Sequence, residues 1–190
     1  MLTQDEVIRL FEEKEAFLSG HFLLSSGLHS PRYLQTALLL QYPDLAEKFG
    51  KELAERAKDC KPDVVAAPAV GGLIIGHEVA KAFGVRFVYT ERVEGKMVFR
   101  RGFEIKPGEK VFTVDSVITT GGSPLEVMDE VTALGGINVG CAVVVNRSSG
   151  RFNPQVPLFS LMEITVPAYN KEDCPLCKEG LPLVKPGSKK

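Results

Sequence analysis

Apolar residues gather in short, almost continuous runs at 64–68, 85–90, 110–115 and 138–146. Such runs, bounded by Gly, Pro or charged residues, are typical of strands buried on both faces. Between them, apolar residues recur every three or four positions, which predicts helices over about 73–83 and from Pro124 onward. Strands that alternate with helices in this way predict an α/β protein whose mainly parallel sheet is flanked by helices. Ligands of such sheets bind at the carboxyl ends of the strands.

The first 60 residues follow a different pattern. Thr3 and Glu6 have the spacing of a capping box, and the helix that they open is expected to have the apolar face Val7, Leu10, Phe11 and Phe17. Residues 18–35 mix apolar runs with Ser, Gly and Pro, which predicts short extended pieces joined by turns. A second helix is expected to begin at Pro43.

Charged residues alternate with apolar ones over 91–110, which predicts a β-ribbon with Gly95 at its turn. The helix that begins at Pro124 is expected to have the apolar face Leu125, Met128, Val131 and Leu134. From Gly180 the chain is rich in Pro, Gly and Lys, so we expect a tail that clings to the surface or frays.

Length and charge narrow the classes of protein. At 190 residues we expect a single domain, 1–190. The net charge of −1 offers no overall basic field for nucleic acid. No apolar run is long enough to span a bilayer, and the acidic N-terminus lacks the features of a secretory signal, so we expect a cytoplasmic protein that binds neither membrane nor nucleic acid.

A phosphate-binding unit is predicted at residues 111–127, VFTVDSVITTGGSPLEV. An apolar strand leads to Asp115, and a turn rich in Thr, Gly and Ser then opens directly into a helix. Glycines allow successive N–H groups to point inward, and the helix start adds partial positive charge, so this turn suits a phosphate monoester. The spacing matches neither a Walker loop nor a dinucleotide fingerprint. An ordinary strand–helix turn is the alternative, but the complete context favours phosphate binding.

This segment resembles the signature with which type I phosphoribosyltransferases bind phosphoribosyl diphosphate (PRPP). Asp115 matches the first of two adjacent acids that bind the ribose hydroxyls in that family, and Ser116 stands where the second is expected. The resemblance implies the type I fold, with a small N-terminal hood and a mobile β-ribbon loop. The residues that it assigns to PRPP within the signature are Asp115, Ser116, Thr119, Thr120, Gly121, Gly122 and Ser123.

The chain as a whole is similar to the short bacterial and archaeal orotate phosphoribosyltransferases. The segments that carry this resemblance are the hood at 20–35, the second loop at 67–80, the mobile loop at 91–105, the base-contacting segment at 146–150 and the ending at 174–188. The hood is expected to come largely from 18–35 and the C-terminal segment. Three positions depart from the better-studied members: Ser25 and Gly71 replace lysines, and Val93 follows Arg92 where Arg-Lys is common.

The resemblance also implies roles. Arg92 and Lys96 would neutralise the pyrophosphate leaving group, with Lys96 and Asp115 as catalytic residues, whereas Arg100 and Arg101 are expected to be surface charges. Thr119 and Arg147 would bind orotate, because an arginine at a strand's carboxyl end can hold a carboxylate with two hydrogen bonds. Mg²⁺ is the expected cofactor, held mainly by PRPP and water rather than by protein ligands. A homodimer that shares the mobile loop between subunits is the expected assembly.

Three alternatives stay open at this point. A purine-base phosphoribosyltransferase would share the PRPP loop and differ at the base pocket. A non-catalytic, PRPP-sensing regulator would keep the fold, and Ser116 and the missing lysines give it some weight. A purely structural α/β protein would leave the Thr/Gly turn and the basic loop unexplained.

The histidines and cysteines show no complete metal motif. His21, His29 and His77 share no metal-ligand spacing and are expected to be structural or exposed, and Cys60 and Cys141 are isolated. Cys174 and Cys177 have the spacing of half a zinc knuckle, but no second pair accompanies them in the sequence. We therefore expect free thiols or a contact that fixes the tail, not a structural metal.

Overall fold

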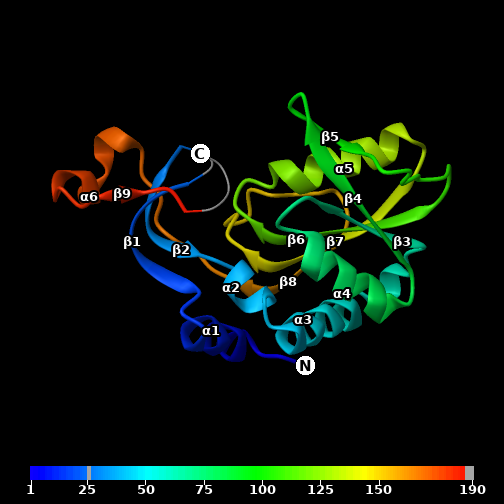
Figure 1. The fold of residues 1–190 in the computed structure, drawn as a ribbon, viewed down its shortest axis with the longest axis horizontal. Coiled ribbons are helices and arrows are strands. Elements are labelled where there is room, and N and C mark those ends of the chain that lie inside the picture. The colour runs from blue at the N-terminus through cyan, green and yellow to red at the C-terminus, as the bar shows by residue number, and fades with distance from the viewer. Residues whose placement is uncertain (25–26, 187–190) are drawn as a thin grey trace.

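The computed structural model describes residues 1–24 and 27–186, and its chain forms one large and one small sheet (Figure 1). The large sheet has the strand order β5-β4-β3-β6-β7-β8, and all neighbours are parallel except β4 and β5. Its strands are β3 (Val64–Pro68), β4 (Arg86–Val93), β5 (Lys96–Phe99), β6 (Lys110–Ile118), β7 (Ile137–Asn146) and β8 (Leu158–Glu163). The expected mainly parallel sheet is therefore confirmed.

Helices cover both faces of the large sheet (Figure 1). On one face lie α1 (Gln4–Glu13), the short α2 (Ala37–Leu40), α3 (Pro43–Arg56) and α4 (Leu73–Phe83), which share a core with Val65, Phe112 and Val144 of the strands. On the other face α5 (Gly122–Ala133) packs Val127 and Val131 against the strands. Pro43 lies in the first turn of α3 and Gly84 ends α4 in a left-handed conformation, both as expected from the sequence.

The strand order reverses direction at β3 and β6. From β3 the chain moves outward to β4 on one side, and it then returns to place β6 on the other side of β3. In open α/β sheets, ligands bind in the crevice at the carboxyl ends of the strands on either side of such a reversal. The loops that follow β3 and β6, residues 69–72 and 119–121, are therefore the expected walls of a binding site.

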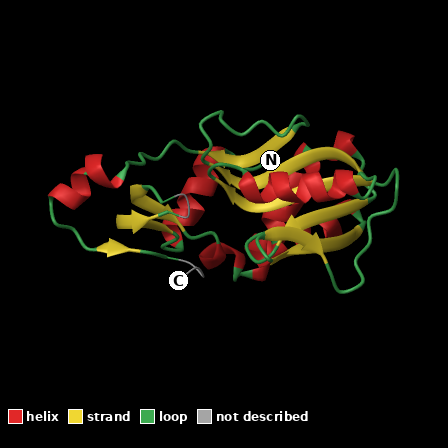
Figure 2. Ribbon diagram, turned by 90° about the horizontal axis from the view of Figure 1, so that it is seen from above, coloured by secondary structure: helices red, strands yellow, loops and turns green. Residues whose placement is uncertain are grey.

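The small sheet lies beside the large one and joins both ends of the chain (Figures 1 and 2). Its strands β1 (Phe17–Leu23) and β2 (His29–Leu34) are antiparallel, and β9 (Leu183–Val184) adds to β1 in parallel. The short elements η2 (Lys171–Asp173) and α6 (Pro175–Lys178) precede β9. We call this unit, residues 17–34 and 169–184, the hood. It contains the strands expected in 18–35, and the tail expected from Gly180 includes β9.

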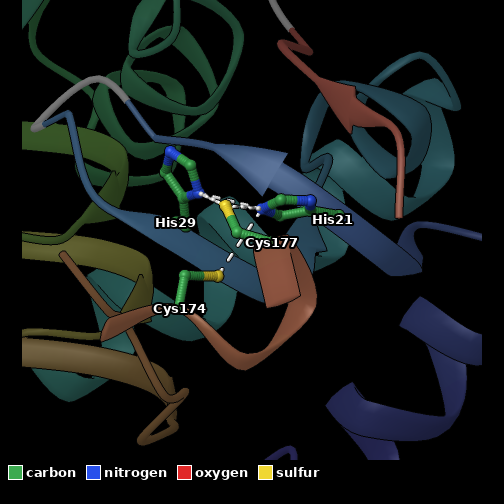
Figure 3. A group of neighbouring side chains, drawn as sticks. All are labelled: His21, His29, Cys174 and Cys177. Carbon is green, nitrogen blue, oxygen red and sulfur yellow. Dashed lines mark hydrogen bonds between the residues drawn. The ribbon is translucent and has the colours of Figure 1, made fainter. Parts of the chain in front are cut away.

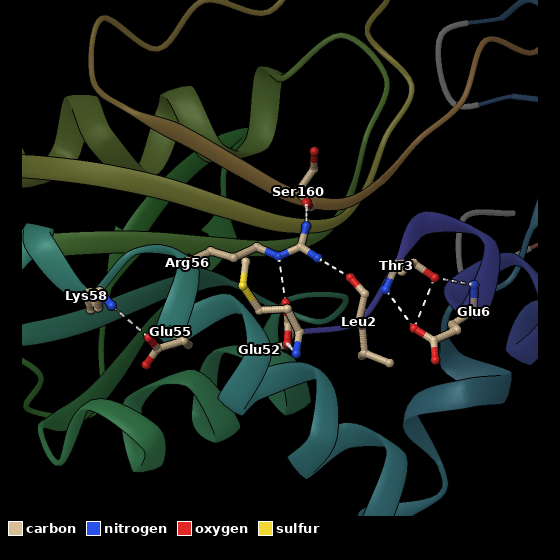
Figure 4. A network of polar contacts seen from close by, with 9 residues as sticks. Leu2, Thr3, Glu6, Glu52, Glu55, Arg56, Lys58 and Ser160 are labelled. Carbon is tan, nitrogen blue, oxygen red and sulfur yellow. Dashed lines mark hydrogen bonds and ion pairs between the residues drawn. The ribbon is translucent and has the colours of Figure 1, made fainter.

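Arg56 links the N-terminal segment to the large sheet (Figure 4). Arg56, at the end of α3, donates to the carbonyl of Leu2 at 2.6 Å and to the carbonyl of Ser160 in β8 at 2.6 Å. Its Nε donates to Glu52 at 2.9 Å. Beside it the expected capping box is present, since Glu6 accepts from the N–H of Thr3 at 2.7 Å and Thr3 caps α1.

Several details differ from the sequence-based predictions. Phe17 begins β1 and does not continue the face of α1, because that helix already ends at Glu13. Leu125 and Leu134 are exposed, so the buried face of α5 is formed by Val127, Met128 and Val131. Asp115 does not end its strand, because β6 stays paired with β7 as far as Ile118. Ser25 lies outside the described residues. In the described part of the chain, no helix has both the length and the apolar character that crossing a membrane requires.

Candidate active site

Asp115 is a buried carboxylate at the reversal of the sheet. Only 8% of it is exposed, and its Oδ1 accepts a hydrogen bond from the N–H of Ser116 at 2.7 Å. Burial raises the pKa of Asp115 from 3.8 to about 7, and the hydrogen bond from Ser116 opposes part of that rise. An acid so placed at the carboxyl end of the sheet can accept hydrogen bonds from the hydroxyl groups of a bound ligand.

The loop after β3 lies against this acid. A side chain built on Gly71 would place its Cβ 3.2 Å from the hydroxyl of Ser116 and 3.6 Å from Oδ1 of Asp115. The peptide bond between Ala69 and Val70 in the same loop is cis. The structure thus brings Gly71, from the loop after β3, together with Asp115 and Ser116 of β6.

The turn after β6 leads directly into α5. Gly121 has a φ of 82° and is the N-cap of α5, a conformation that favours glycine, and no side chain of the described residues caps the helix. The ring of Phe152 lies directly against Gly121, whereas a Cβ on Gly122 would meet only the hydroxyl of Thr120, at 4.0 Å. Thr120 and Gly122 are exposed, and Thr119 and Ser123 are half-buried. An uncapped helix start in a turn that contains Thr119, Thr120 and Ser123 is an arrangement that binds anions.

Arg147 follows β7, beside the turn. Its backbone N–H donates to the carbonyl of Ile118 at 2.8 Å, which places Arg147 beside the end of β6, where the turn begins at Thr119. Only 7% of Arg147 is exposed, and its buried Nε has no hydrogen-bond partner among the described residues. Burial lowers the pKa of Arg147. A buried guanidinium with an unpaired donor suits an anionic ligand.

Tyr33 of the hood lies near Arg147. Burial raises the pKa of Tyr33, and the charge of Arg147 opposes part of that rise. Tyr33 of the hood is therefore within range of the charge of Arg147, which follows β7. Sequence reasoning singled out neither Tyr33 nor Phe152, although Tyr33 lies in the stretch 20–35 that resembles the family's hood.

The basic loop forms the expected hairpin of β4 and β5. Glu94 and Gly95 make its turn, both with positive φ, and Val93 pairs with Lys96. Arg92 forms an ion pair of 2.9 Å with Glu126 of α5. Lys96 is exposed, and in the described chain no hydrogen bond or ion pair joins Arg92 or Lys96 to Asp115 or Arg147.

The two outer arginines of the hairpin differ from each other. Arg101 forms an ion pair of 2.8 Å with Glu91, and Arg100 is exposed. Both are surface charges, as expected. The structure therefore gathers the signature residues and Arg147 in one place and leaves the basic side chains of the hairpin apart from them.

A hollow of about 990 Å³ lies away from these residues. The N-terminus, α3 and α4 line it. Its lining mixes negative side chains such as Glu52 with positive ones such as Lys81. The buried acid, the uncapped helix start and the unpaired arginine all lie elsewhere. We assign the site by these chemical features and not by the size of the hollow.

The comparisons with known proteins identify the class. Residues 39–173 match the family model described as the phosphoribosyl transferase domain. The chain therefore belongs to the phosphoribosyltransferase family. The matched range contains the loops after β3 and β6, the hairpin and Arg147.

The relatives narrow the class further. The chain is 49% identical over 189 residues to an orotate phosphoribosyltransferase of Caldanaerobacter subterraneus subsp. tengcongensis and 50% identical over 189 residues to one of Pelotomaculum thermopropionicum, with 100% of each chain covered in both comparisons. Its place in the family is with the orotate phosphoribosyltransferases.

The fold is shared more widely than the sequence. The crystal structure of orotate phosphoribosyltransferase from Aeropyrum pernix matches with a TM-score of 0.71 at 23% identity, over 83% of this chain and 93% of that one. An adenine phosphoribosyltransferase from Thermoanaerobacter pseudethanolicus matches with a TM-score of 0.61 at 20% identity, over 70% of this chain and 88% of that one. The fold alone therefore does not distinguish the base.

Proposed function

We propose that this protein transfers the ribose 5-phosphate group of PRPP to orotate and releases orotidine 5′-phosphate and pyrophosphate. A ring nitrogen of orotate forms the new bond to the anomeric carbon, and the bond from that carbon to the diphosphate oxygen breaks. The observation that carries the proposal is the buried, partly unpaired Arg147 beside the phosphate-binding turn, in a chain whose full-length relatives are named orotate phosphoribosyltransferases.

PRPP would occupy the reversal of the sheet. The uncapped start of α5 and the hydroxyl groups of Thr119, Thr120 and Ser123 support binding of the 5-phosphate at 119–123. The ribose hydroxyls would donate to Asp115, with Ser116 beside it. The ribose hydroxyls would replace water around this buried acid. Hydrogen bonds to its carboxylate would then be stronger, because less water surrounds them.

Orotate would lie between the turn and β7. Its carboxylate would accept hydrogen bonds from the guanidinium of Arg147, and Thr119 would help to orient the ring. Purine bases carry no carboxylate, and their binding would leave Arg147 buried without a counter-charge. The purine alternative and the regulatory alternative are not favoured, because the relatives that match the whole chain are named as orotate enzymes.

The leaving group would meet the hairpin. Charge builds on the pyrophosphate oxygens as the bond breaks, and Lys96 and Arg92 are the cations that the hairpin could bring to them. Because Arg92 is paired with Glu126, its use requires that pair to open or to be shared. Positioning and charge stabilisation, rather than covalent chemistry, would supply most of the rate.

Mg²⁺ fits this site as a partner of the substrate. In the described part of the chain, one group of side chains could hold a metal ion, and it consists of two histidines and two cysteines of the hood. It contains no carboxylate and does not include Asp115. We therefore propose that Mg²⁺ is held mainly by PRPP oxygens and water, where it would neutralise diphosphate charge. No residue of this chain is assigned as its ligand.

We also propose a homodimer, with the hairpin 91–105 shared between subunits, and a cytoplasmic location. The hairpin supports the first proposal, because it carries Lys96 exposed on the edge strand β5. None of Cys60, Cys141, Cys174 and Cys177 forms a disulfide, which is compatible with a reducing compartment.

Pyrophosphate release tests the proposal. The purified protein is incubated with PRPP and Mg²⁺ and with orotate, uracil, adenine, guanine or xanthine in separate reactions. We expect release with orotate and little with the other bases. Release with adenine but not orotate would contradict the choice of base, and no release with any base would favour the regulatory alternative.

A further inference from the structure

We propose that the hood contains a structural zinc site formed by His21, His29, Cys174 and Cys177. The ligand atoms of these four side chains lie within 4.8 Å of one another (Figure 3). No second pair accompanies this cysteine pair in the sequence. Its partners are histidines about 150 positions earlier in the chain, which only the folded structure brings near.

The geometry suits a tetrahedral ion. Nε2 of His21 lies 2.9 Å from Nδ1 of His29 and 3.6 Å and 3.7 Å from the sulfurs of Cys174 and Cys177, and Cys177 Sγ lies 3.2 Å from His29 Nδ1. With Zn–N bonds of about 2.0–2.1 Å and Zn–S bonds of about 2.3 Å, neighbouring ligands in a tetrahedron are about 3.3–3.8 Å apart. Adjustments of a few tenths of an ångström would therefore complete the site.

The hydrogen bonds of His21 indicate which atom faces the ion. Its Nδ1 lies 2.8 Å from the carbonyl of Leu181, which can only accept, so Nδ1 carries the proton and Nε2 presents its lone pair to the cluster. A metal-ligating histidine commonly donates its other N–H in this way, which fixes the ring and the tautomer. Leu181 thus supports the site from outside.

Hydrogen bonding alone accounts poorly for this cluster. Three groups, His29 Nδ1 and the two thiols, converge on Nε2 of His21, which has a single lone pair. At most one of them makes a good hydrogen bond to that lone pair. A cation satisfies all four groups at once, because each one then donates its own lone pair to the ion.

The C-terminal part of the hood buries little apolar surface. Within residues 171–184, Cys174 is the only buried side chain, and Leu183 and Val184 of β9 are 45% and 51% exposed. A segment that buries so little apolar surface needs a disulfide or a metal to hold it. A site that joins β1 and β2 to α6 would supply this link.

Zinc is the metal that the ligands favour. Two imidazoles and two thiolates form the Cys₂His₂ set of closed structural zinc sites, and Cys174 and Cys177 have the usual Cys-x₂-Cys spacing. Both thiols would release their protons to solvent when the ion binds. The charges of the two thiolates would then balance the charge of Zn²⁺. With all four positions taken by protein, the ion would have no open position for substrate, so its role would be structural.

Metal analysis of the intact chain is the first test. The protein is expressed with zinc in the medium, without a polyhistidine tag, and its metal content is measured by mass spectrometry. We expect about one zinc per chain. The variant Cys174→Ala/Cys177→Ala should lose it, whereas Cys60→Ser and His77→Gln, which alter a cysteine and a histidine outside the cluster, should keep it. Equal zinc in all variants, or iron in stoichiometric amount, would contradict the proposal.

Cobalt provides a test that needs no variant. After removal of metal by a chelator, the wild-type protein is titrated with Co²⁺. We expect the intense visible bands of tetrahedral cobalt and a thiolate charge-transfer band, both abolished by one equivalent of Zn²⁺. Weak octahedral bands, or no saturable binding, would overturn the site. If the double cysteine variant fails to fold, the cobalt spectrum of the wild-type protein and the zinc content of the single variant Cys177→Ser still test the site.

Hydrogen exchange locates the effect. Removing the metal should speed exchange in 17–23, 29–34 and 171–184, and adding Zn²⁺ should restore protection there. Exchange in β7, which lies in the core of the large sheet, should not change. Unchanged exchange in the hood would show that no metal stabilises it.

Discussion

The ring of Phe152 lies against Gly121, whereas a Cβ on the neighbouring Gly122 would have only the hydroxyl of Thr120 near it, at 4.0 Å. The two adjacent glycines of the phosphate-binding turn therefore have different reasons to be glycine. Gly121 is required by its φ of 82° and by the ring behind it, and Gly122 is expected to be required by the ligand in front of it.

We predict that Gly122→Val lowers PRPP affinity at least about tenfold while the protein stays folded, because the added methyl groups occupy the space that the 5-phosphate needs. Gly121→Val should instead lower stability, since it clashes with Phe152 and strains the backbone. Isothermal titration with PRPP and urea unfolding of both variants distinguish these effects. PRPP affinity unchanged in a folded Gly122→Val protein would show that the phosphate binds elsewhere.

Replacing the buried acid should separate binding from stability. Asp115→Asn keeps the shape but removes the charged acceptor, so we expect a loss of PRPP affinity of about tenfold or more. The measurement is PRPP binding at pH 8, where Asp115 of the parent is largely ionised. Asp129→Asn, on the exposed face of α5, serves as the control and should bind PRPP normally.

The same acid predicts a pH dependence of stability. Since the pKa of Asp115 is raised from 3.8 to about 7, the folded protein holds between these values a proton that the unfolded chain releases. Its contribution to the free energy of unfolding is therefore greatest below pH 4 and is lost as the pH rises to 7. Asp115→Asn should be more stable than the parent at pH 8, by up to roughly 4 kcal/mol, and less so at pH 5. Urea unfolding at both values tests this, and an equal difference at the two pH values would refute it.

Base choice should depend on Arg147. Orotate differs from uracil by a carboxylate, and a charge-assisted contact to it is worth roughly 1.5–3 kcal/mol. We predict that Arg147→Ala lowers the preference for orotate over uracil by one to two orders of magnitude, and that Arg147→Lys recovers only part of it, because an ammonium lacks the planar fork. Steady-state turnover with both bases measures the preference. An equal loss on both bases would assign Arg147 to PRPP binding or to folding.

The hood should affect the same step. Tyr33 is within range of the charge of Arg147, so Tyr33→Phe, which removes only the hydroxyl, is expected to raise KM for orotate several-fold with little change in KM for PRPP. Tyr42→Phe, on the surface near α3, is the matched control. A change in KM for PRPP alone would place the role of Tyr33 at the other substrate.

Local sequence patterns predicted much of the large sheet and its helices. The buried strand at 64–68, the helix at 73–83 with its glycine end and the hairpin turn at Gly95 are set by short-range rules, and each lies where it was expected. The phosphate-binding turn was equally accessible, because its strand, glycines and helix are contiguous in the chain.

Other features depend on partners far away in the sequence. The extension of β6 past Asp115 follows from its pairing with β7, and β8 was not anticipated because its apolar residues show no clear period. The pairing of Cys174 with His21 and the contact of Phe152 with Gly121 arise only when distant segments meet. Contacts between residues so far apart in the chain produce no regular spacing in the sequence, so a sequence pattern does not reveal them.

The pairing of β9 with β1 sets an order of assembly on the ribosome. The large sheet and its helices are complete once β8 has emerged, but β1 waits for Leu183 and Val184 before its second edge is covered. Because domains fold as their residues become available, the PRPP-binding half can form while the hood is still open. The nascent chain would thus acquire its phosphate site before β9 covers the second edge of β1.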